Sequence, residues 1–208
     1  AIAHVLRCFE DGDITHVEGT IDPLADADTV ETELMLADLE SLEKRADNLR
    51  KKAATKDKKA VEELEMVELA LGELQDGRPA RCADIPQGRE QDYKNLQLLT
   101  AKPVLYVCNV EEESAGSGNS LSEKVKQKAA SKGAEAVIIS ARIEEELAQL
   151  DDAERLEYLA TLDLEEPGLN RLIRQGYQLL DLITYFTSGP KETRAWTIKR
   201  GTAAPQAA

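Results

Sequence analysis

Apolar positions along the chain fall into two kinds of pattern, short unbroken runs and periodic stretches. Mostly apolar runs without helical period occupy residues 2–9, 104–108 and 134–139, each followed by polar or turn-forming residues. Runs of this length without alternation are typical of strands buried on both faces, as in a parallel sheet. Residues 193–199 alternate instead, and we expect a further strand there.

Periodic stretches predict a pair of long helices. From Met35 the apolar residues step by four and three, and the same stepping returns over residues 60–74 after the polar connector 51–59. A repeat of about 3.5 residues keeps an apolar seam facing a partner helix. We therefore expect an antiparallel helical hairpin, or coiled coil, preceded by a loop over residues 16–28.

Further helices are expected around the strands. A helix over residues 120–132 completes a strand–helix–strand unit. Residues 143–163 are acidic and predicted to be helical. Pro167 opens another helix that we expect to continue through Ile183 until Gly189 and Pro190 end it.

Charge and composition narrow the class of protein. The formal net charge is -14, so phosphates would repel most of the surface and any contact with nucleic acid must be local. No apolar stretch approaches the roughly 20 residues that cross a bilayer, and residues 1–10 lack the basic start of a signal peptide. The three cysteines have no zinc-site spacing, and we expect free thiols, no metal site and a soluble, cytoplasmic protein.

Two loops that follow neighbouring strands carry the most informative chemistry. Asn109-Val110-Glu111-Glu112 follows one buried strand, and Ser140-Ala141-Arg142 follows the next. Open α/β sheets hold ligands beyond the carboxyl ends of their strands. The first loop alone would indicate only an Asn turn with a solvated acidic run. Together, the loops resemble the two base-recognition motifs of translation-factor-class P-loop nucleotidases, an NKxD-type loop and an S-A-[KR] loop that sandwich the base.

Glu112 bears on which base is read. GTPases of the resembled class have Asp at this position, and its two oxygens accept from the two adjacent donors of guanine. Adenine offers an acceptor at N7 and a donor at N6, which the Asn109 amide can match, whereas its N1 acceptor would face a carboxylate unfavourably. The longer Glu112 side chain and Val110 in place of Lys therefore favour ATP. The alternative is a GTPase in which Glu112 reaches the guanine donors.

Four longer segments resemble, in order, the YchF or Obg-like ATPase family: HVLRCFE at 4–10, TELMLADL at 32–39, EEPGLNR at 165–171 and RAWTI at 194–198. The resemblance covers essentially the whole chain. It implies an α/β G domain with a parallel sheet, interrupted by a helical hairpin and followed by a TGS domain. The expected parts are the first G-domain strand and loop (1–27), the hairpin insertion (28–77), the remaining G domain with the base motifs and closing helices (78–187), and the beginning of the TGS domain (188–208).

Both ends of the chain look cut, because it starts at Ala1 inside an apolar run and stops at Ala208 without a terminating signal. Neither a G-x-x-x-x-G-K-[ST] phosphate loop nor a D-x-x-G switch occurs in it. The Gly-rich stretch 116–120 lacks a Lys and is expected to be a flexible surface loop. The resemblance then implies an internal fragment of an ATPase, inactive alone, whose cofactors are ATP and Mg²⁺, with the Mg²⁺ ligands upstream of Ala1.

The resemblance also implies roles for individual residues. Those expected at the base are Asn109, Val110, Glu112, Ser140, Ala141 and Arg142. Among them, Ser140 and Ala141 would present backbone amides to the base edge, and Arg142 would pack nearby. His16, in the loop after the first strand, would promote attack of water, since an imidazole can fill that role near neutral pH. His4 and Cys108 are expected to be structural.

A basic cluster lies at the expected hairpin tip: Arg50, Lys51, Lys52, Lys56, Lys58 and Lys59. With Asp57 the tip carries about +5 in an otherwise acidic chain, which suggests a docking point. Charge alone fits a solvated helix turn equally well. The family's association with ribosomes favours the ribosome or its RNA as partner, with no DNA or membrane partner expected. A non-catalytic alternative makes the hairpin a ribosome- or RNA-binding module whose geometry the nucleotide switches.

Overall fold

The computed structural model describes residues 1–10 and 21–207 of the chain. They form two compact units, one made of Ala1–Leu24 with Val104–Ala208 and the other of Ala25–Pro103. The first unit is built on a parallel sheet and the second on a pair of helices. Within the described ranges, no helix is long and apolar enough to cross a membrane.

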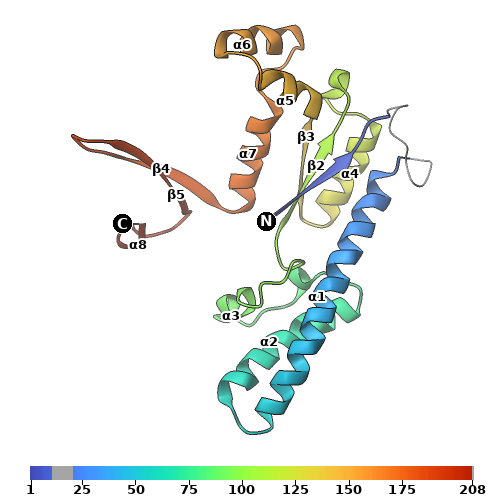
Figure 1. The fold of residues 1–208 in the computed structure, drawn as a ribbon, viewed down its shortest axis with the longest axis vertical. Helices are drawn as coiled ribbons and strands as arrows, with labels where there is room; N and C mark the ends of the chain where they lie inside the picture. The colour runs from blue at the N-terminus through green and yellow to red at the C-terminus, as the bar shows by residue number, and fades with distance from the viewer. Residues whose placement is uncertain (11–20, 208) are drawn as a thin grey trace. The chain divides into compact units, whose positions relative to one another are not determined.

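A three-stranded parallel sheet forms the centre of the first unit (Figure 1). Its strands, in spatial order, are β1 (Ile2–Arg7), β2 (Val104–Asn109) and β3 (Glu135–Ile139). Asn109 lies beside both Arg7 and Ile139 in the register, so the carboxyl ends of the three strands are level. This sheet confirms the parallel α/β arrangement that the unbroken apolar runs predict.

Helices cover both faces of this sheet. The α7 helix (Gly168–Leu179) packs on one face, where Leu172 joins Leu105 in a core cluster. The α4 helix (Ser120–Ser131) joins β2 to β3 and buries Val125 against the opposite face, toward which alternate strand side chains point. The predicted strand–helix–strand unit is therefore confirmed.

The acidic stretch after β3 folds as two helices. They are α5 (Ala141–Leu147) and α6 (Asp152–Thr161). The single helix predicted over residues 143–163 is wrong, because the Asp151 side chain accepts hydrogen bonds from two backbone amides of the next turn and starts a new helix there. Three buried residues from both helices share one small core: Ile143, Leu147 and Leu159.

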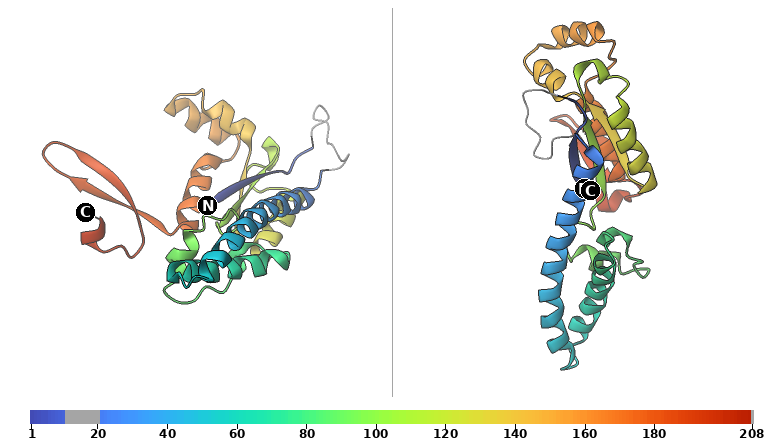
Figure 2. Two further views of the ribbon diagram at one scale, coloured as in Figure 1. Left: turned by 60° about the horizontal axis from the view of Figure 1, so that its bottom comes forward. Right: turned by 90° about the vertical axis from the view of Figure 1, so that its right-hand side faces the viewer.

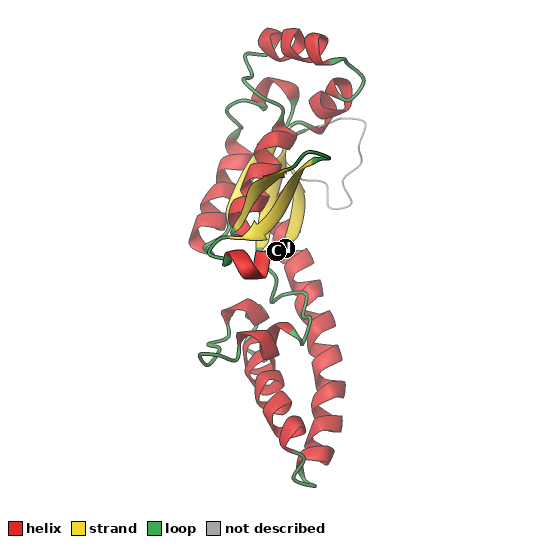
Figure 3. Ribbon diagram, turned by 90° about the vertical axis from the view of Figure 1, so that its left-hand side faces the viewer, coloured by secondary structure: helices red, strands yellow, loops and turns green. Residues whose placement is uncertain are grey.

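An antiparallel strand pair follows α7 (Figure 3). Its strands are β4 (Leu182–Ser188) and β5 (Thr193–Lys199), and the short helix α8 (Ala204–Ala207) follows them. The strand expected at 193–199 is confirmed, but the helix predicted to run through Ile183 is wrong. It ends at Leu179 because Asp181 adopts a φ of 52° and the residues that follow are mostly β-branched or aromatic. That this hairpin begins a TGS domain stays a prediction.

Two long helices dominate the second unit (Figure 2). They are α1 (Pro23–Ala53) and α2 (Lys58–Gln75), which lie side by side and are joined by a turn. One core cluster joins both helices to the segment that follows α2, and its helical members are Leu42, Ala46 and Leu49 of α1 with Ala60, Met66, Val67, Ala70, Leu71 and Leu74 of α2. The predicted pair of amphipathic helices is present, and its supercoiling as a coiled coil stays a prediction.

The first long helix begins earlier than its sequence pattern predicts. It starts at Pro23, inside the stretch 16–28 that was expected to be a loop. The Asp22 carboxylate accepts a hydrogen bond from the Leu24 amide at 3.0 Å. Because proline is also favoured at the first helical position, these residues form a helix start that the apolar stepping from Met35 does not reveal.

A buried carboxylate ties α1 to the segment that closes the helical unit. That segment contains the short helices η1 (Ala80–Cys82) and α3 (Glu90–Lys94). Asp38 is 4% exposed and accepts hydrogen bonds from the Leu99 amide at 2.9 Å and from the Thr100 amide and hydroxyl, each at 2.7 Å. Tyr93 donates to the Ala80 carbonyl at 2.6 Å, and burial raises the pKa of Tyr93 to about 12.

We expect Asp38→Ala to lower the free energy of unfolding of the helical unit by about 2–4 kcal/mol, because two amides and a hydroxyl lose a charged acceptor where water does not reach them. Urea denaturation of the whole chain, followed by circular dichroism, measures this. Glu43→Ala, on the exposed side of the same helix, is the control and should change the free energy by less than about 0.5 kcal/mol. Equal stability of the two variants would contradict the role of Asp38.

Candidate functional site

The two predicted loops meet at the carboxyl edge of the sheet. Backbone hydrogen bonds extend the strand pairing into the loops. The Cys8 amide donates to the Asn109 carbonyl (2.8 Å), and the Val110 amide donates to the Ile139 carbonyl (2.9 Å). A cavity of about 720 Å³ lies beside them. Its lining includes every residue that the sequence predicts for the base: Asn109, Val110, Glu112, Ser140, Ala141 and Arg142. Phe9 and Glu10, which follow β1, complete one wall.

Asn109 joins the two loops through its side chain. Its Oδ1 atom accepts a hydrogen bond from the Ala141 amide at 2.9 Å. This fixes the orientation of the side-chain amide, and no described residue accepts from its Nδ2 group, which stays available as a donor. The Ala141 amide, which the sequence predicts at a base edge, donates to Asn109 in this structure. Val110, at 2% exposed, forms a buried part of the same lining.

An ion pair forms a second link between the loops. The Arg142 Nε atom lies 2.8 Å from the Glu112 Oε1 atom. The Arg142 side chain is 74% exposed and that of Glu112 is 34% exposed, so the pair borders the cavity and remains open to solvent. Exposed pairs of this kind contribute about 0–1 kcal/mol to folding, so this pair adds little to stability.

Sequence reasoning missed two residues that hold the first loop in place, Glu111 and Asn119. The Asn119 Nδ2 group donates to Glu111 Oε2 at 2.9 Å and to the Cys8 carbonyl at 2.6 Å, and the Ser114 hydroxyl also donates to Glu111. Burial acts to raise the pKa of Glu111, but these side-chain hydrogen bonds and its own backbone amide outweigh burial and hold that pKa below its usual range. Asn119 thus connects the end of β1 to the loop after β2.

Asn119 also fixes the Gly-rich stretch that precedes α4. Its Oδ1 atom accepts from the Leu121 and Ser122 amides, and the Ser122 hydroxyl accepts from the Asn119 amide, which completes a capping box. Gly118 has a φ of 81°, and a Cβ there would lie 2.5 Å from Ser122 Oγ and 2.6 Å from Ile138 Cδ1. Gly118 and Asn119 therefore form a closely packed helix start, while residues 116, 117 and 120 are exposed, as expected for a surface loop.

Two buried cysteines lie beside the site. Cys8 and Cys108 are free thiols, and both are fully buried. A hydrogen bond with Cys108, followed by burial, raises the pKa of Cys8, so this thiol stays protonated near neutral pH. This arrangement fits the structural role expected for Cys108.

The expected catalytic residue His16 lies outside the described residues, so its position relative to the cavity stays a prediction. Within residues 1–10 and 21–207, no group of three or more His, Cys, Asp and Glu side chains is arranged to hold a metal ion. The described residues therefore do not fit a Mg²⁺ site.

The predicted basic tip comprises the last turn of α1, the connection after it and the first residues of α2. Its five lysines, at positions 51, 52, 56, 58 and 59, are all exposed, and none has a carboxylate partner among the described residues. Arg50 contacts Asp47 and Glu68, at 3.4 and 3.5 Å. The one acid of the tip, Asp57, accepts hydrogen bonds from the amides that open α2. The tip therefore presents uncompensated positive charge to solvent.

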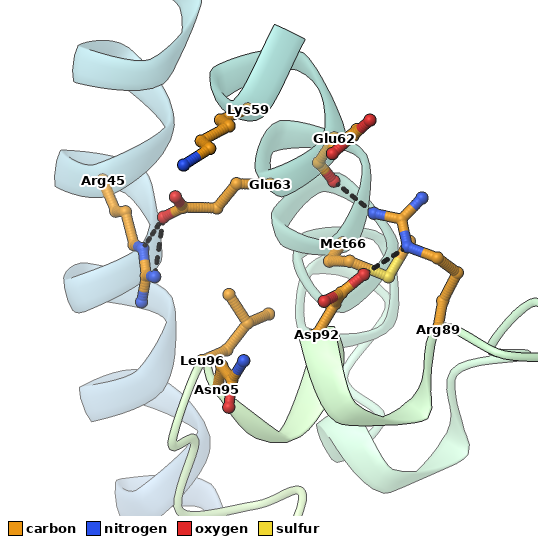
Figure 4. Close-up of a pocket in the computed structure, with 9 residues that line it drawn as sticks. All are labelled: Arg45, Lys59, Glu62, Glu63, Met66, Arg89, Asp92, Asn95 and Leu96. Atoms are coloured by element: carbon orange, nitrogen blue, oxygen red, sulfur yellow. Dashed lines mark hydrogen bonds and ion pairs between the residues drawn. The ribbon is translucent and has the colours of Figure 1, made fainter.

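A second cavity, of about 310 Å³, lies among α1, α2 and α3 (Figure 4). Its charged residues are largely paired with one another. Arg45 contacts Glu63 at 2.6 Å, and Arg89 binds both Asp92, at 2.5 Å, and the Glu62 carbonyl, at 2.8 Å (Figure 4). These contacts connect the three helices, and we interpret them as structural.

The parallel sheet and the two linked loops at its carboxyl edge place the chain among the open α/β proteins, which hold ligands beyond the carboxyl ends of their strands. Comparison with known proteins is more specific. The chain is 48% identical to the "Ribosome-binding ATPase YchF" of Haemophilus influenzae over 208 residues, which are 100% of this chain and 57% of that protein. It is 43% identical to the protein of the same name from Bacillus subtilis over 210 residues, with the same coverage. The chain belongs to the YchF family.

A solved structure and a family match agree with this assignment. The solved YchF GTPase of Schizosaccharomyces pombe superimposes with a TM-score of 0.84 at 35% identity, over 100% of this chain and 57% of that one. The family YchF-GTPase_C, described as a protein of unknown function (DUF933), matches residues 182–208, from the first residue of β4 onward. The chain spans 57% of the length of the curated relatives it matches.

We expect Asn119→Ala to lower the free energy of unfolding of the sheet unit by about 1–3 kcal/mol, because it removes a helix cap and leaves the Cys8 carbonyl without its side-chain donor. Asn119→Asp is the informative control, since it keeps a capping oxygen but places a carboxylate against Glu111. Chemical denaturation of both variants separates the contribution of the helix cap from that of the link to Cys8 and Glu111. An Asp variant as stable as the original chain would show that the link to Cys8 and Glu111 contributes nothing.

Proposed function

We propose that the full-length protein, with any segments that precede or follow these residues, binds and hydrolyses ATP, and that this chain supplies the recognition of the base. The single observation that carries the proposal is the Asn109 side chain, which the Ala141 amide orients beside the cavity with its Nδ2 donor available. The names of the relatives support the activity, because they are called ribosome-binding ATPases and the solved relative is called a GTPase.

In this proposal each lining residue has a defined part at the base. Asn109 Nδ2 donates to the N7 acceptor of adenine, while Val110, at 2% exposed, anchors the first loop in the core beside the base. Glu112 and Arg142 border the edge of the base as a pair, and Ser140 begins the second loop. The Ala141 amide acts indirectly, by holding Asn109.

Hydrolysis needs groups other than the base loops. We propose that His16 assists the attack of water, as the family resemblance implies, and that Mg²⁺ and the phosphates are held by residues outside those described here. We propose the same domain organisation that the sequence predicts, with residues 28–77 as a coiled-coil hairpin inserted in a G domain and residues 188–208 as the beginning of a TGS domain. The C-terminal family matches from residue 182 onward, which supports a domain boundary close to residue 188.

Competition of ATP against GTP on the full-length protein tests the base assignment. We expect ATP to bind more tightly, and Asn109→Ala to weaken ATP binding roughly 10- to 100-fold, because the variant loses both the donor to N7 and the bond that fixes the second loop. Displacement of a fluorescent nucleotide measures both. Asn95→Ala is the control and should bind ATP normally, because this exposed asparagine lines the second, structural cavity and not the one beside Asn109. A clear preference for GTP would establish the GTPase alternative, which the name of the S. pombe relative favours.

We further propose that the basic tip contacts ribosomal RNA. The five exposed and unpaired lysines support this, since phosphates bind where positive charge is concentrated and uncompensated. The names of the bacterial relatives describe them as ribosome-binding. In the non-catalytic alternative this contact is the main activity, and the nucleotide only switches the geometry of the hairpin.

Charge reversal distinguishes the tip from the rest of the surface. We expect Lys→Glu at positions 51, 52, 58 and 59 together to abolish most ribosome binding and to flatten its dependence on salt, because each lost phosphate contact removes a released counterion. Cosedimentation of the full-length protein with ribosomes at several salt concentrations measures both effects. The matched control reverses four exposed lysines elsewhere, at 94, 102, 124 and 191, with the same change in net charge. Equal loss in both variants would mean that overall charge, and not the tip, governs binding.

A further inference from the structure

The ion pair at the cavity edge changes what the Glu112 carboxylate can do. Glu112 follows β2, and Arg142 belongs to the loop after β3, yet Arg142 Nε and Glu112 Oε1 are 2.8 Å apart. Arg142 directly follows Ala141, whose amide is bonded to Asn109. The same short loop therefore orients the Asn109 side chain, through the Ala141 amide, and forms an ion pair with the Glu112 carboxylate, through Arg142.

We propose that Arg142 is a specificity-determining residue that turns the site away from guanine by occupying Glu112. This inference rests on the proposed function, since it presupposes that a purine base enters the cavity. A carboxylate selects guanine when both of its oxygens accept from the adjacent N1–H and N2–H donors. With one oxygen bonded to a guanidinium, the Glu112 carboxylate is a weaker and less freely oriented pair of acceptors for guanine, and its charge is compensated.

Arg142 favours adenine by a second route. The N1 atom of adenine is an acceptor, which a bare carboxylate would repel. A guanidinium has five N–H donors, so Arg142 keeps donors free for N1 while one of them faces Glu112. The pair therefore presents a donor where a carboxylate alone would present only acceptors.

Neighbouring groups keep Arg142 directed at Glu112. Among the described residues, a second carboxylate, that of Glu146, lies 3.9 Å from Arg142 Nε, a longer contact than that of Glu112. Glu146 accepts a hydrogen bond from the Tyr158 hydroxyl, and this bond raises the pKa of Tyr158 to about 12. Because Glu146 is engaged by a phenol that stays protonated, it competes weakly for the guanidinium.

The test is the ratio of GTP to ATP dissociation constants in the full-length protein. We expect Arg142→Ala to reduce the preference for ATP roughly two- to tenfold, through tighter GTP binding and weaker ATP binding, a range set by the modest strength of exposed ion pairs. Arg142→Lys keeps the charge but has fewer donors. Its ratio of dissociation constants should fall between those of the original protein and of Arg142→Ala. Arg174→Ala, which removes an exposed, ion-paired arginine that does not line the cavity, is the matched control and should leave the ratio unchanged.

A double-mutant cycle with Glu112→Gln decides whether Arg142 acts through Glu112. Arg142→Ala should change the ratio clearly less in the Glu112→Gln background than in the original protein. An unchanged ratio in Arg142→Ala, with ATP still bound, overturns the inference, as does an equal shift in both backgrounds. If the original protein binds neither nucleotide, the proposed function itself fails, and that outcome is distinct because it appears before any substitution is made. Thermal unfolding of each variant shows whether a loss of binding reflects misfolding.

Discussion

The hydrogen bond from the Ala141 amide to Asn109 Oδ1 is the contact on which the candidate site depends. It becomes possible because β1, β2 and β3 are parallel and end level, so the loops after β2 and β3 start side by side. An asparagine at a strand end is free to rotate, and this bond fixes which end of its amide faces the cavity. Orientation of a donor before a ligand arrives avoids part of the entropy cost of binding.

The candidate site could be predicted from the sequence because its residues stand at strand ends, and strand ends are visible as the limits of apolar runs. Its supporting contacts could not be predicted. Asn119 binds the Cys8 carbonyl across more than a hundred residues of sequence, and neither its spacing nor its neighbours indicate that contact. For the same reason Glu111 resembled part of a solvated acidic run, although it accepts three side-chain hydrogen bonds.

The fold shows a similar division. Apolar runs and helical periods located the sheet and the helix pair, since burial sets those patterns. Errors fell where a local polar group or a backbone conformation decides the end of an element. Asp22 starts α1 early, Asp151 divides the acidic helix in two, and Asp181, with its positive φ, ends α7 before β4. In each case a single residue decides where a helix begins or ends, although the apolar pattern over several turns predicts another position.

Asn119 takes part in the cap of α4, in the loop after β2 and in the exit of β1 at the same time. Fraying of a helix end is normally a local event that its neighbours do not sense. Here the first turn of α4 cannot open without releasing the carboxylate beside the cavity and the carbonyl at the end of β1. The three segments therefore form one cooperative unit of local unfolding, and the mobility of the cavity rim is set by a helix terminus that does not itself line it.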